Sequence, residues 1–279
     1  MPELPEVETI VRQLQNTLQG KTIESMEIFD KKSFNRKRNF NRNGKVFPLK
    51  SIQKLTSAKI IKVERRAKAI LFGLEGKKYL FIRLGMTGHF SYAEEREQRK
   101  KKYAVAAFHF SDGTSLTFHD IRKFGSLQLI SEQKLRQELR RIGPEPLDKQ
   151  FTSSLLLQLL QKKKNANLKT TLMDQSVIAG IGNIYAQEAL YHARINPQRT
   201  AGSLTLQEAK KLYIRLQSIL RKAIAAGGST VDNYSSLEGA GSFQQHLAVY
   251  QQERCPQKHL LQRIVLGGRG TWWCKACQR

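Results

Sequence analysis

Cysteine, long apolar runs and acidic residues are all scarce in this sequence. The 279 residues include three cysteines, all after residue 254, so we expect no disulfide framework and a reducing environment. No apolar run approaches the roughly 20 residues that cross a bilayer, and the acidic N-terminal stretch predicts no signal peptide. These absences argue against a secreted or membrane-spanning protein and favour a cytoplasmic one.

The charge balance is strongly basic. Lys and Arg number 48 against 23 Asp and Glu, which gives a formal net charge of +25. An excess of this size indicates a polyanionic partner, and nucleic acid is the commonest one. Composition alone leaves two alternatives open, a generic basic surface and attraction to an anionic membrane surface.

The pattern of apolar residues changes after residue 131, which predicts two domains and an α+β fold class. A helix is expected over 7–18 and a strand over 22–29, and short β-type runs between 55 and 130 predict an antiparallel sandwich. Helical patterns follow at 131–142, 151–163, 183–193 and 205–226, and short strands and turns at 244–279. The segment 143–150, rich in Gly and Pro, is the expected hinge.

Three polar segments are expected to form loops. Residues 30–50 are basic and rich in Asn, and residues 94–102 read as a charged hairpin tip. Residues 227–242 are polar and glycine-rich with few apolar anchors, which predicts a mobile loop.

The first eight residues, Met-Pro-Glu-Leu-Pro-Glu-Val-Glu, contain a candidate nucleophile. Met1 precedes a small residue and should be removed, which leaves Pro2 with a secondary amine at the N-terminus. An α-amino group has a pKa of about 7.7–8.0, so a useful fraction is unprotonated and can attack a sugar C1′ to form a cationic Schiff base. Glu3 can transfer protons, and Glu6 lies one helical turn beyond it. The alternative is a cluster of acids that suits the first turn of a helix.

Three basic stretches adjoin predicted strands. Arg65-Arg66-Ala67-Lys68 precedes an apolar strand, and Arg83-Leu84-Gly85-Met86-Thr87-Gly88 and Asp120-Ile121-Arg122-Lys123-Phe124-Gly125 are glycine-containing turns. Alone, each is a weak signal, since a solvated basic edge or a core methionine would also explain it. The glycines favour a turn that pushes Met86 outward.

The most specific internal stretch is Asp-Gln-Ser-Val-Ile-Ala-Gly-Ile-Gly-Asn-Ile-Tyr, residues 174–185. Gly180 and Gly182 permit tight turns, and Asn183 begins a predicted helix. Exposed N–H groups at a helix start bind phosphate, and an Asn side chain adds a donor. The alternative is a helix-turn-helix corner that serves packing alone.

Taken together, these stretches resemble the formamidopyrimidine-DNA glycosylase family of bacterial repair enzymes, in order from Pro2 to Cys277. The resemblance implies a bifunctional glycosylase and AP lyase that removes oxidised purines, such as 8-oxoguanine and formamidopyrimidines, from damaged double-stranded DNA. Strand cleavage would follow by β,δ-elimination from a Schiff base on Pro2. Leu4 favours this branch over the endonuclease VIII branch, which usually has Gly there and prefers oxidised pyrimidines.

The resemblance also implies an architecture. A β-sandwich catalytic domain would span 1–132, a helix-two-turn-helix domain 143–243, and a zinc-finger hairpin 244–279, with DNA in the cleft between sandwich and helical domain. The protein would act as a monomer in the cytoplasm, associated with the nucleoid.

Residue roles follow from the same resemblance. Pro2, Glu3 and Lys68 would be catalytic, with Glu6 as structural support. A wedge would enter the duplex where a base is flipped out; its members are Met86, Arg122 and Phe124. The further DNA contacts are Arg83, Lys123, Lys169, Asn183 and Arg269, besides Lys68. Lys123 stands where the family often has Arg, so charge is kept but bidentate geometry is lost.

The C-terminal finger departs most from the family, which has two Cys-x2-Cys pairs that bind structural zinc. Cys274 and Cys277 form one intact pair, but the first pair is reduced to Cys255, with Lys258 where the second thiolate would fall. With the adjacent His259, the cysteines would make a Cys3His set, an accepted zinc-ligand composition. The alternative is a metal-free hairpin.

A different class of function stays open, that of a catalytically silent protein that binds DNA damage. The intact Pro2, Glu3 and Lys68 argue against it, whereas the altered finger keeps it in view.

Overall fold

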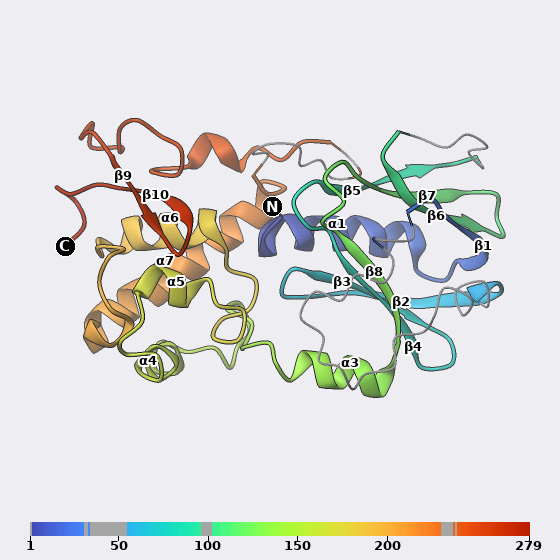
Figure 1. Ribbon diagram of the computed structural model, residues 1–279, viewed down its shortest axis with the longest axis horizontal. Coiled ribbons are helices and arrows are strands. Elements are labelled where there is room, and N and C mark those ends of the chain that lie inside the picture. Colours follow the sequence, from blue (N-terminus) through green and yellow to red (C-terminus); the bar gives the residue numbers. More distant parts are fainter. Residues whose placement is uncertain (1, 31–32, 34–54, 96–101, 230–236, 238) are drawn as a thin grey trace. The chain divides into compact units, whose positions relative to one another are not determined.

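The structure is a computed structural model that describes residues 2–30, 33, 55–95, 102–229, 237 and 239–279 (Figure 1). The predicted loop over 30–50 therefore falls almost wholly outside the described residues, as do parts of 94–102 and 227–242. The chain divides into two compact units. The first comprises residues 1–2, 6–141 and 229–241, and the second comprises residues 3–5, 142–228 and 242–279.

The N-terminal helix α1 spans Leu4–Leu18, as the apolar spacing predicted. Apolar side chains recur every three or four residues along one stripe, and all are buried: Val7, Ile10, Val11, Leu14 and Leu18. The chain turns after the helix at Gly20, whose φ of +90° is a conformation that favours glycine.

All strand pairings in the first unit are antiparallel. The strands are β1 Thr22–Ile28, β2 Ala58–Arg66, β3 Ala69–Leu74, β4 Lys78–Arg83, β5 Gly88–Ala93, β6 Ala104–Phe110, β7 Ser115–Asp120 and β8 Ser126–Ser131. Their order, β5-β7-β6-β1-β2-β3-β4-β8, forms two four-stranded halves that join at β1 and β2. That joint is short, with the register Thr22 to Lys59 and Ile23 to Ala58.

Strand β3 shows how the sandwich buries both faces of a strand. Ile70 and Phe72 belong to the main apolar cluster, which also contains the buried stripe of α1 and residues of both halves of the sheet. Leu71, one residue along, points to the opposite face and joins a smaller cluster with Phe81 and Leu135. Leu135 belongs to helix α3, Glu132–Leu139, so this helix covers the second face.

The second unit is mainly helical. Its helices are α4 Ser153–Gln161, α5 Leu168–Leu172, α6 Asn183–Ala193 and α7 Leu206–Ala225, with short 3-10 turns η3 Ala201–Ser203 and η4 Phe243–His246. Local capping explains where several begin: Thr152 caps α4, Asn167 caps α5, and Thr205 forms a capping box with Glu208 at α7. The sequence pattern predicted α4, α6 and α7 but not the five-residue α5.

A two-stranded hairpin follows near the C-terminus. Strand β9, Gln262–Leu266, pairs with β10, Arg269–Trp273, through the turn Gly267-Gly268. Both glycines have positive φ, +57° and +73°, as a two-residue hairpin turn of type I′ requires. The expected α+β fold, with a sandwich, a helical part and a terminal hairpin, is thus confirmed.

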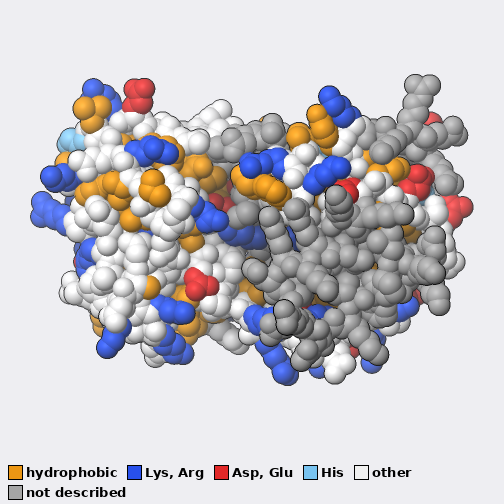
Figure 2. Space-filling model, viewed as in Figure 1, with side chains coloured by type: hydrophobic (Ala, Val, Ile, Leu, Met, Phe, Trp, Pro, Cys, Tyr) orange, Lys and Arg blue, Asp and Glu red, His pale blue; other side chains and the backbone are white. Residues whose placement is uncertain are grey.

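The basic composition is visible on the surface. On the face in view, Lys and Arg side chains clearly exceed Asp and Glu (Figure 2). Among the described helices, none is both long enough and apolar enough to cross a membrane.

Candidate functional site

The start of helix α6 holds the side chain of Glu3. Gly182 precedes the helix and has no side chain to cap it. The Glu3 carboxylate, 2% exposed, takes that place, since it accepts the N–H of Ile184 at 2.9 Å and of Tyr185 at 3.4 Å. An acidic residue near the N-terminus of the chain thereby satisfies a helix start more than 180 positions later.

Leu4 joins the same part of the second unit. Its N–H donates to the Gly180 carbonyl at 3.0 Å. Gly180 has a φ of +79°, and a Cβ there would lie 2.7 Å from Leu4 Cβ. Only glycine allows this close approach without a shift of the backbone, which gives a physical reason for the first glycine of Gly-Ile-Gly-Asn.

Lys169 and Asn183 lie beside this helix start. Lys169 is fully buried and donates from Nζ to Asn183 Oδ1 at 2.5 Å, and Asn183 Nδ2 donates to the Gly270 carbonyl at 3.2 Å. Burial lowers the pKa of Lys169 to about 8; the Arg269 cation adds to this effect, and Glu3 opposes it. The structure therefore brings together Glu3, Lys169, Asn183 and Arg269, four residues that the sequence nominated separately.

Gln187 connects the hairpin to helix α6 by hydrogen bonds. The sequence analysis did not identify this residue. Its Nε2 donates to the carbonyls of Asn183, at 2.7 Å, and Gly270, at 3.3 Å. Its Oε1 accepts the N–H of Trp272 at 2.6 Å. The side chain is 1% exposed, and its position one turn after Asn183 was the only signal available in the sequence.

Glu188 holds the segment that leads into the finger. Its carboxylate accepts three consecutive backbone N–H groups, from Ala248 at 2.8 Å, Val249 at 3.0 Å and Tyr250 at 2.9 Å. Burial raises the pKa of Glu188, and the three donors work against that rise. The consecutive residues Gln187 and Glu188 of α6 thus position both the finger hairpin and the segment that leads into it.

In the first unit, Lys68 lies in the two-residue turn between β2 and β3. Ala67, the other turn residue, has a φ of +52°. Arg65 stabilises the turn, because it donates to the Ala67 carbonyl at 3.2 Å and to the Glu8 carboxylate at 2.7 Å. Glu6 is buried and accepts the N–H of Ser229 at 2.8 Å, so it supports the start of the segment that follows Gly228.

The turns that carry Met86 and Arg122 are joined through Asp120. The Asp120 carboxylate, fully buried, accepts the Thr87 hydroxyl and the Gly125 N–H, each at 2.5 Å. Thr87 Oγ in turn accepts the N–H of Arg122 at 3.0 Å. Thr87 and Asp120 were part of the quoted motifs but were not nominated as site residues.

The tips of these turns expose the expected wedge residues to different degrees. Met86 and Phe124 are half-buried, whereas Arg122 and Lys123 are exposed. The Arg122 guanidinium lies 4.9 Å from the Phe124 ring centroid, a cation–π distance. Arg83, at the end of β4, lies 4.9 Å from the Phe81 ring centroid, and burial lowers the pKa of its guanidinium.

The C-terminal cluster brings Cys255, His259, Cys274 and Cys277 together, with all four ligand atoms within 4.8 Å of one another. His259 Nδ1 lies 3.7, 3.6 and 3.4 Å from the three Sγ atoms in that order. A tetrahedral ion with Zn–S near 2.3 Å and Zn–N near 2.0–2.1 Å requires an S···N separation of about 3.6 Å. The four side chains therefore fit a metal ion.

The turn between Cys255 and His259 places the histidine beside the thiols. Cys255 N–H donates to the His259 carbonyl at 3.0 Å, which closes the loop. Lys258, within this turn, has a φ of +64°. The predicted ligand His259, rather than Lys258, is therefore the residue that the turn places beside the thiols.

Two family models match this chain. The formamidopyrimidine-DNA glycosylase N-terminal domain matches residues 1–127, and the formamidopyrimidine-DNA glycosylase H2TH domain matches residues 142–235. Together these matches cover most of the chain.

Whole-length relatives agree with the family models. Formamidopyrimidine-DNA glycosylase from Exiguobacterium sibiricum is 39% identical over 100% of this chain and 99% of its own. The enzyme from Wolbachia sp. subsp. Drosophila simulans is 38% identical and covers 100% of both chains.

Solved structures share the fold. A Lactococcus lactis Fpg variant in complex with DNA that contains Fapy-dG has a TM-score of 0.89, 32% identity and 100% coverage of both chains. The MutM (Fpg) protein of Thermus thermophilus has a TM-score of 0.84 and 38% identity, and covers 99% of this chain and 98% of its own.

The contact between the turn that carries Met86 and the turn that carries Arg122 yields a stability prediction. Gly85 has a φ of +68°, and a Cβ there would lie 2.6 Å from the Gly125 nitrogen. Gly85→Ala should lower the free energy of unfolding by about 2–5 kcal/mol, the sum of left-handed strain and overpacking. Urea unfolding followed by circular dichroism measures the loss.

Gly76→Ala is the matched control, since Gly76 is also a hairpin-turn glycine, with φ +74°, but a Cβ at that position would have no atom within 4 Å. This variant should lose only the strain, about 1–2 kcal/mol. Equal losses in the two variants would show that the contact between the two turns does not constrain Gly85.

Proposed function

The chain belongs to the formamidopyrimidine-DNA glycosylase family, and from that premise we propose a base-excision repair enzyme for oxidised purines in double-stranded DNA. The observation that carries the proposal is the anchoring of Glu3 at the start of α6, beside Lys169 and Asn183. Glu3 follows Pro2 in the chain, and this contact holds its carboxylate in one orientation. A group that transfers protons at a reacting sugar requires such a fixed position.

The proposed nucleophile is the nitrogen of Pro2 after removal of Met1. Its lone pair forms a bond to C1′ of the damaged nucleotide, and the bond from C1′ to the base breaks, with its electron pair passing to the base. Pro2 loses its N–H proton, and Glu3 supplies a proton to the departing base or to the sugar oxygen O4′. The C1′–O4′ bond then breaks with its electron pair on O4′, and the nitrogen lone pair forms a C1′=N double bond, so the product is a ring-opened cationic Schiff base. Loss of a C2′ proton then expels the 3′ phosphate, and a second elimination expels the 5′ phosphate. Lys68 would assist by contact with the phosphates.

DNA would be gripped by groups in both units. In the second unit, Asn183 and Arg269 supply an amide and an exposed guanidinium to phosphate oxygens, and the buried Lys169 adds a cation behind Asn183, to which it donates a hydrogen bond. In the first unit, Met86 and Phe124 would enter the base stack, and the remaining contacts would come from Arg122, Lys123 and Arg83. Functional domains at 1–132, 143–243 and 244–279 follow the same proposal.

The metal that the finger would hold is zinc. Three thiolates and one imidazole are a ligand set that suits zinc, and the S···N distances of 3.4–3.7 Å support tetrahedral coordination. The ion would fix the loop at Cys255 to the end of β10, and so keep Arg269 in place on the hairpin.

The proton-transfer role can be tested with Glu3→Gln. The amide retains an oxygen that can accept the Ile184 N–H, so the fold should persist, but it cannot donate a carboxylic proton. Excision of 8-oxoguanine should slow by about 10²–10⁴-fold, while affinity for an uncleavable abasic analogue changes little.

Glu132→Gln removes the same charge from an exposed surface pair with Arg136 and should excise at the wild-type rate. Excision by Glu3→Gln at the wild-type rate would reduce Glu3 to a helix-capping group. Binding of damaged DNA without excision by the wild-type protein would instead identify a silent damage binder.

The pKa of Lys169 predicts a pH dependence. Because that pKa is lowered to about 8, the free protein loses the ammonium charge as pH rises through 8. A bound phosphate favours the charged form and raises this pKa, so DNA affinity should be steady below pH 8 and fall above it, by up to about tenfold per pH unit.

Lys169→Met should bind DNA more weakly at pH 7, and its DNA affinity should not fall above pH 8. The slope of the logarithm of its DNA affinity against the logarithm of salt concentration should be shallower by about one unit. Fluorescence anisotropy at several pH values and salt concentrations measures both effects. An unchanged pH profile in Lys169→Met would assign the decline to another group.

Metal analysis tests the finger. The purified chain should contain about one zinc ion. His259→Ala should lose it to a chelator far sooner than the wild type and should bind DNA more weakly, because Arg269 is then poorly held.

Lys258→Asn is the control, since Asn tolerates the positive φ of that position and the ligand set is untouched. It should retain the metal. Zinc-free wild-type protein, purified without chelators, would contradict the Cys3His site.

A further inference from the structure

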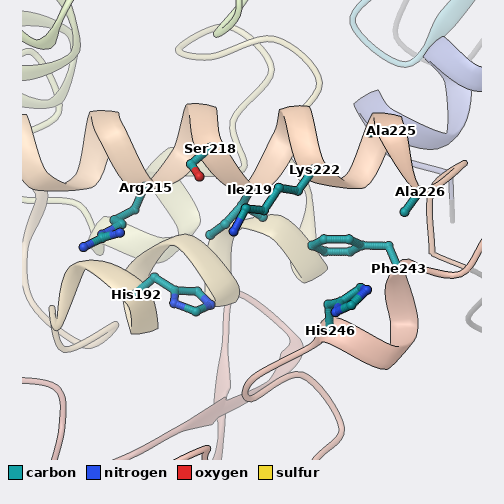
Figure 3. A pocket seen from close by; sticks show the side chains of 9 residues that line it. All are labelled: His192, Arg215, Ser218, Ile219, Lys222, Ala225, Ala226, Phe243 and His246. Atoms are coloured by element: carbon teal, nitrogen blue, oxygen red, sulfur yellow. The ribbon is translucent and has the colours of Figure 1, made fainter.

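The second unit contains a pocket that the proposed repair reaction does not use. It lies between the last turn of α6, the middle and last turns of α7 and the turn η4 (Figure 3), and its volume is about 620 Å³. This volume is in the usual range of small-molecule sites, roughly 300–1,000 Å³. None of the residues assigned above to catalysis, DNA contact or metal binding lines it.

Four nitrogen-bearing side chains give the pocket its charge: His192, Arg215, Lys222 and His246. In Figure 3, His192 and Arg215 lie at one end and His246 at the other, with Lys222 between them. No Asp or Glu lines the pocket among the described residues, and in that part of the chain neither Arg215 nor Lys222 forms an ion pair.

The charges of Arg215 and Lys222 both act at the His192 ring. Its pKa is lowered first by burial and then by the charges of Arg215 and Lys222. The nearest acid is Glu188, whose Oε2 lies 3.9 Å from His192 Nε2. Glu188 does not line the pocket, and both of its oxygens accept backbone N–H groups of the segment that leads into the finger.

The rest of the lining is apolar except for Ser218. Phe243 forms one wall, with its ring 5.9 Å from the Tyr185 ring and 5.9 Å from the His246 ring. Ile219 and the two alanines at the end of α7 continue this surface, and Ser218 adds one hydroxyl. The pocket therefore offers a cationic side and a flat apolar side to the same ligand.

Helix dipoles explain only part of this arrangement. His192 and Lys222 lie in the last turns of α6 and α7, where cationic groups are favourable in any case. Arg215 lies in the middle of α7, so the dipole gives no reason for it. Nor does the phosphate site at the start of α6 extend here, because His192 is nine residues beyond Asn183, about 14 Å along the helix.

We propose that this pocket binds a phosphate group carried beside a flat ring, as in a nucleotide. Arg215 and Lys222 would pair with the phosphate oxygens, with hydrogen bonds from His192 and Ser218. The base would lie along the wall formed by Phe243 and His246. The nucleotide can be free or can be the phosphorylated end of a DNA strand, since both present the same chemistry.

The test uses the full-length protein and deoxyadenosine 5′-monophosphate, with deoxyadenosine and inorganic phosphate as partial ligands. Calorimetry gives affinities, and the ring signals of His192 and His246 in NMR report on the pocket itself. The mononucleotide should bind at least tenfold more tightly than either partial ligand and should shift both histidine signals.

The variant Arg215→Gln with Lys222→Gln should weaken mononucleotide binding at least tenfold. Lys162→Gln with Lys163→Gln, at the exposed end of α4, removes the same charge elsewhere and should bind as the wild type does. Excision of 8-oxoguanine should be unchanged in both double variants, so failure of this site is distinguishable from failure of the proposed repair function.

A strand-end ligand is distinguished by two single-stranded oligonucleotides of one sequence, with and without a 5′ phosphate. Histidine shifts that depend on the 5′ phosphate would support the site with the strand end as its ligand, even if the mononucleotide binds weakly. Equal binding of deoxyadenosine and its monophosphate, together with no dependence on the 5′ phosphate, would overturn the proposal. Equal weakening in the two double variants would overturn it as well, since binding would then follow net charge alone.

Discussion

The start of helix α6 requires hydrogen-bond acceptors that its own sequence does not provide, and Glu3 provides them. With Gly182 before the helix, the N–H groups of Ile184 and Tyr185 are buried and would have no capping side chain. Loss of the Glu3 carboxylate would leave these donors unsatisfied, at a cost of about 1–3 kcal/mol each. The helix dipole adds to the attraction. The proposed catalytic acid therefore also stabilises the helix against which it is held.

Helix α6 organises the second unit from that point onward. Asn183 connects the buried Lys169 to Gly270 in strand β10. One helical turn later, Gln187 accepts the N–H of Trp272 in the same strand, and Glu188 accepts backbone N–H groups of the segment that leads into the finger. The Cys3His cluster lies at the other end of the finger, where Cys274 directly follows strand β10. The loop from Cys255 to His259 can thus supply its two ligands while the hairpin stays fixed to α6.

Periodicity predicted the elements whose apolar residues repeat along one face. Helix α1 and helix α7 are examples, because each buries a single stripe of apolar residues. The choice of His259 over Lys258 as a metal ligand followed instead from ligand chemistry. Helix α6 was recognisable from its glycine-rich start rather than from periodicity, since it is buried almost all round and has no polar face.

Long-range polar contacts could not be predicted from the sequence. The bond from Glu3 to Ile184, the clamp of Gln187 and the joint at Asp120 each depend on residues that the fold brings together. A glutamine or aspartate in a sequence carries no sign of its distant partner. The pocket beside α7 could not be predicted from the sequence for the same reason, because His192, Arg215 and His246 come from three separate elements.

The central claim is that the N-terminal amine of Pro2 is the nucleophile, and reductive trapping tests it most directly. Protein verified to lack Met1 would be incubated with an 8-oxoguanine duplex and borohydride, and the cross-linked peptide would be sequenced by mass spectrometry. We predict a covalent adduct on the nitrogen of Pro2, and none from protein that retains Met1. An adduct on Lys68 or Lys169 instead, or equal trapping by protein that retains Met1, would contradict the claim.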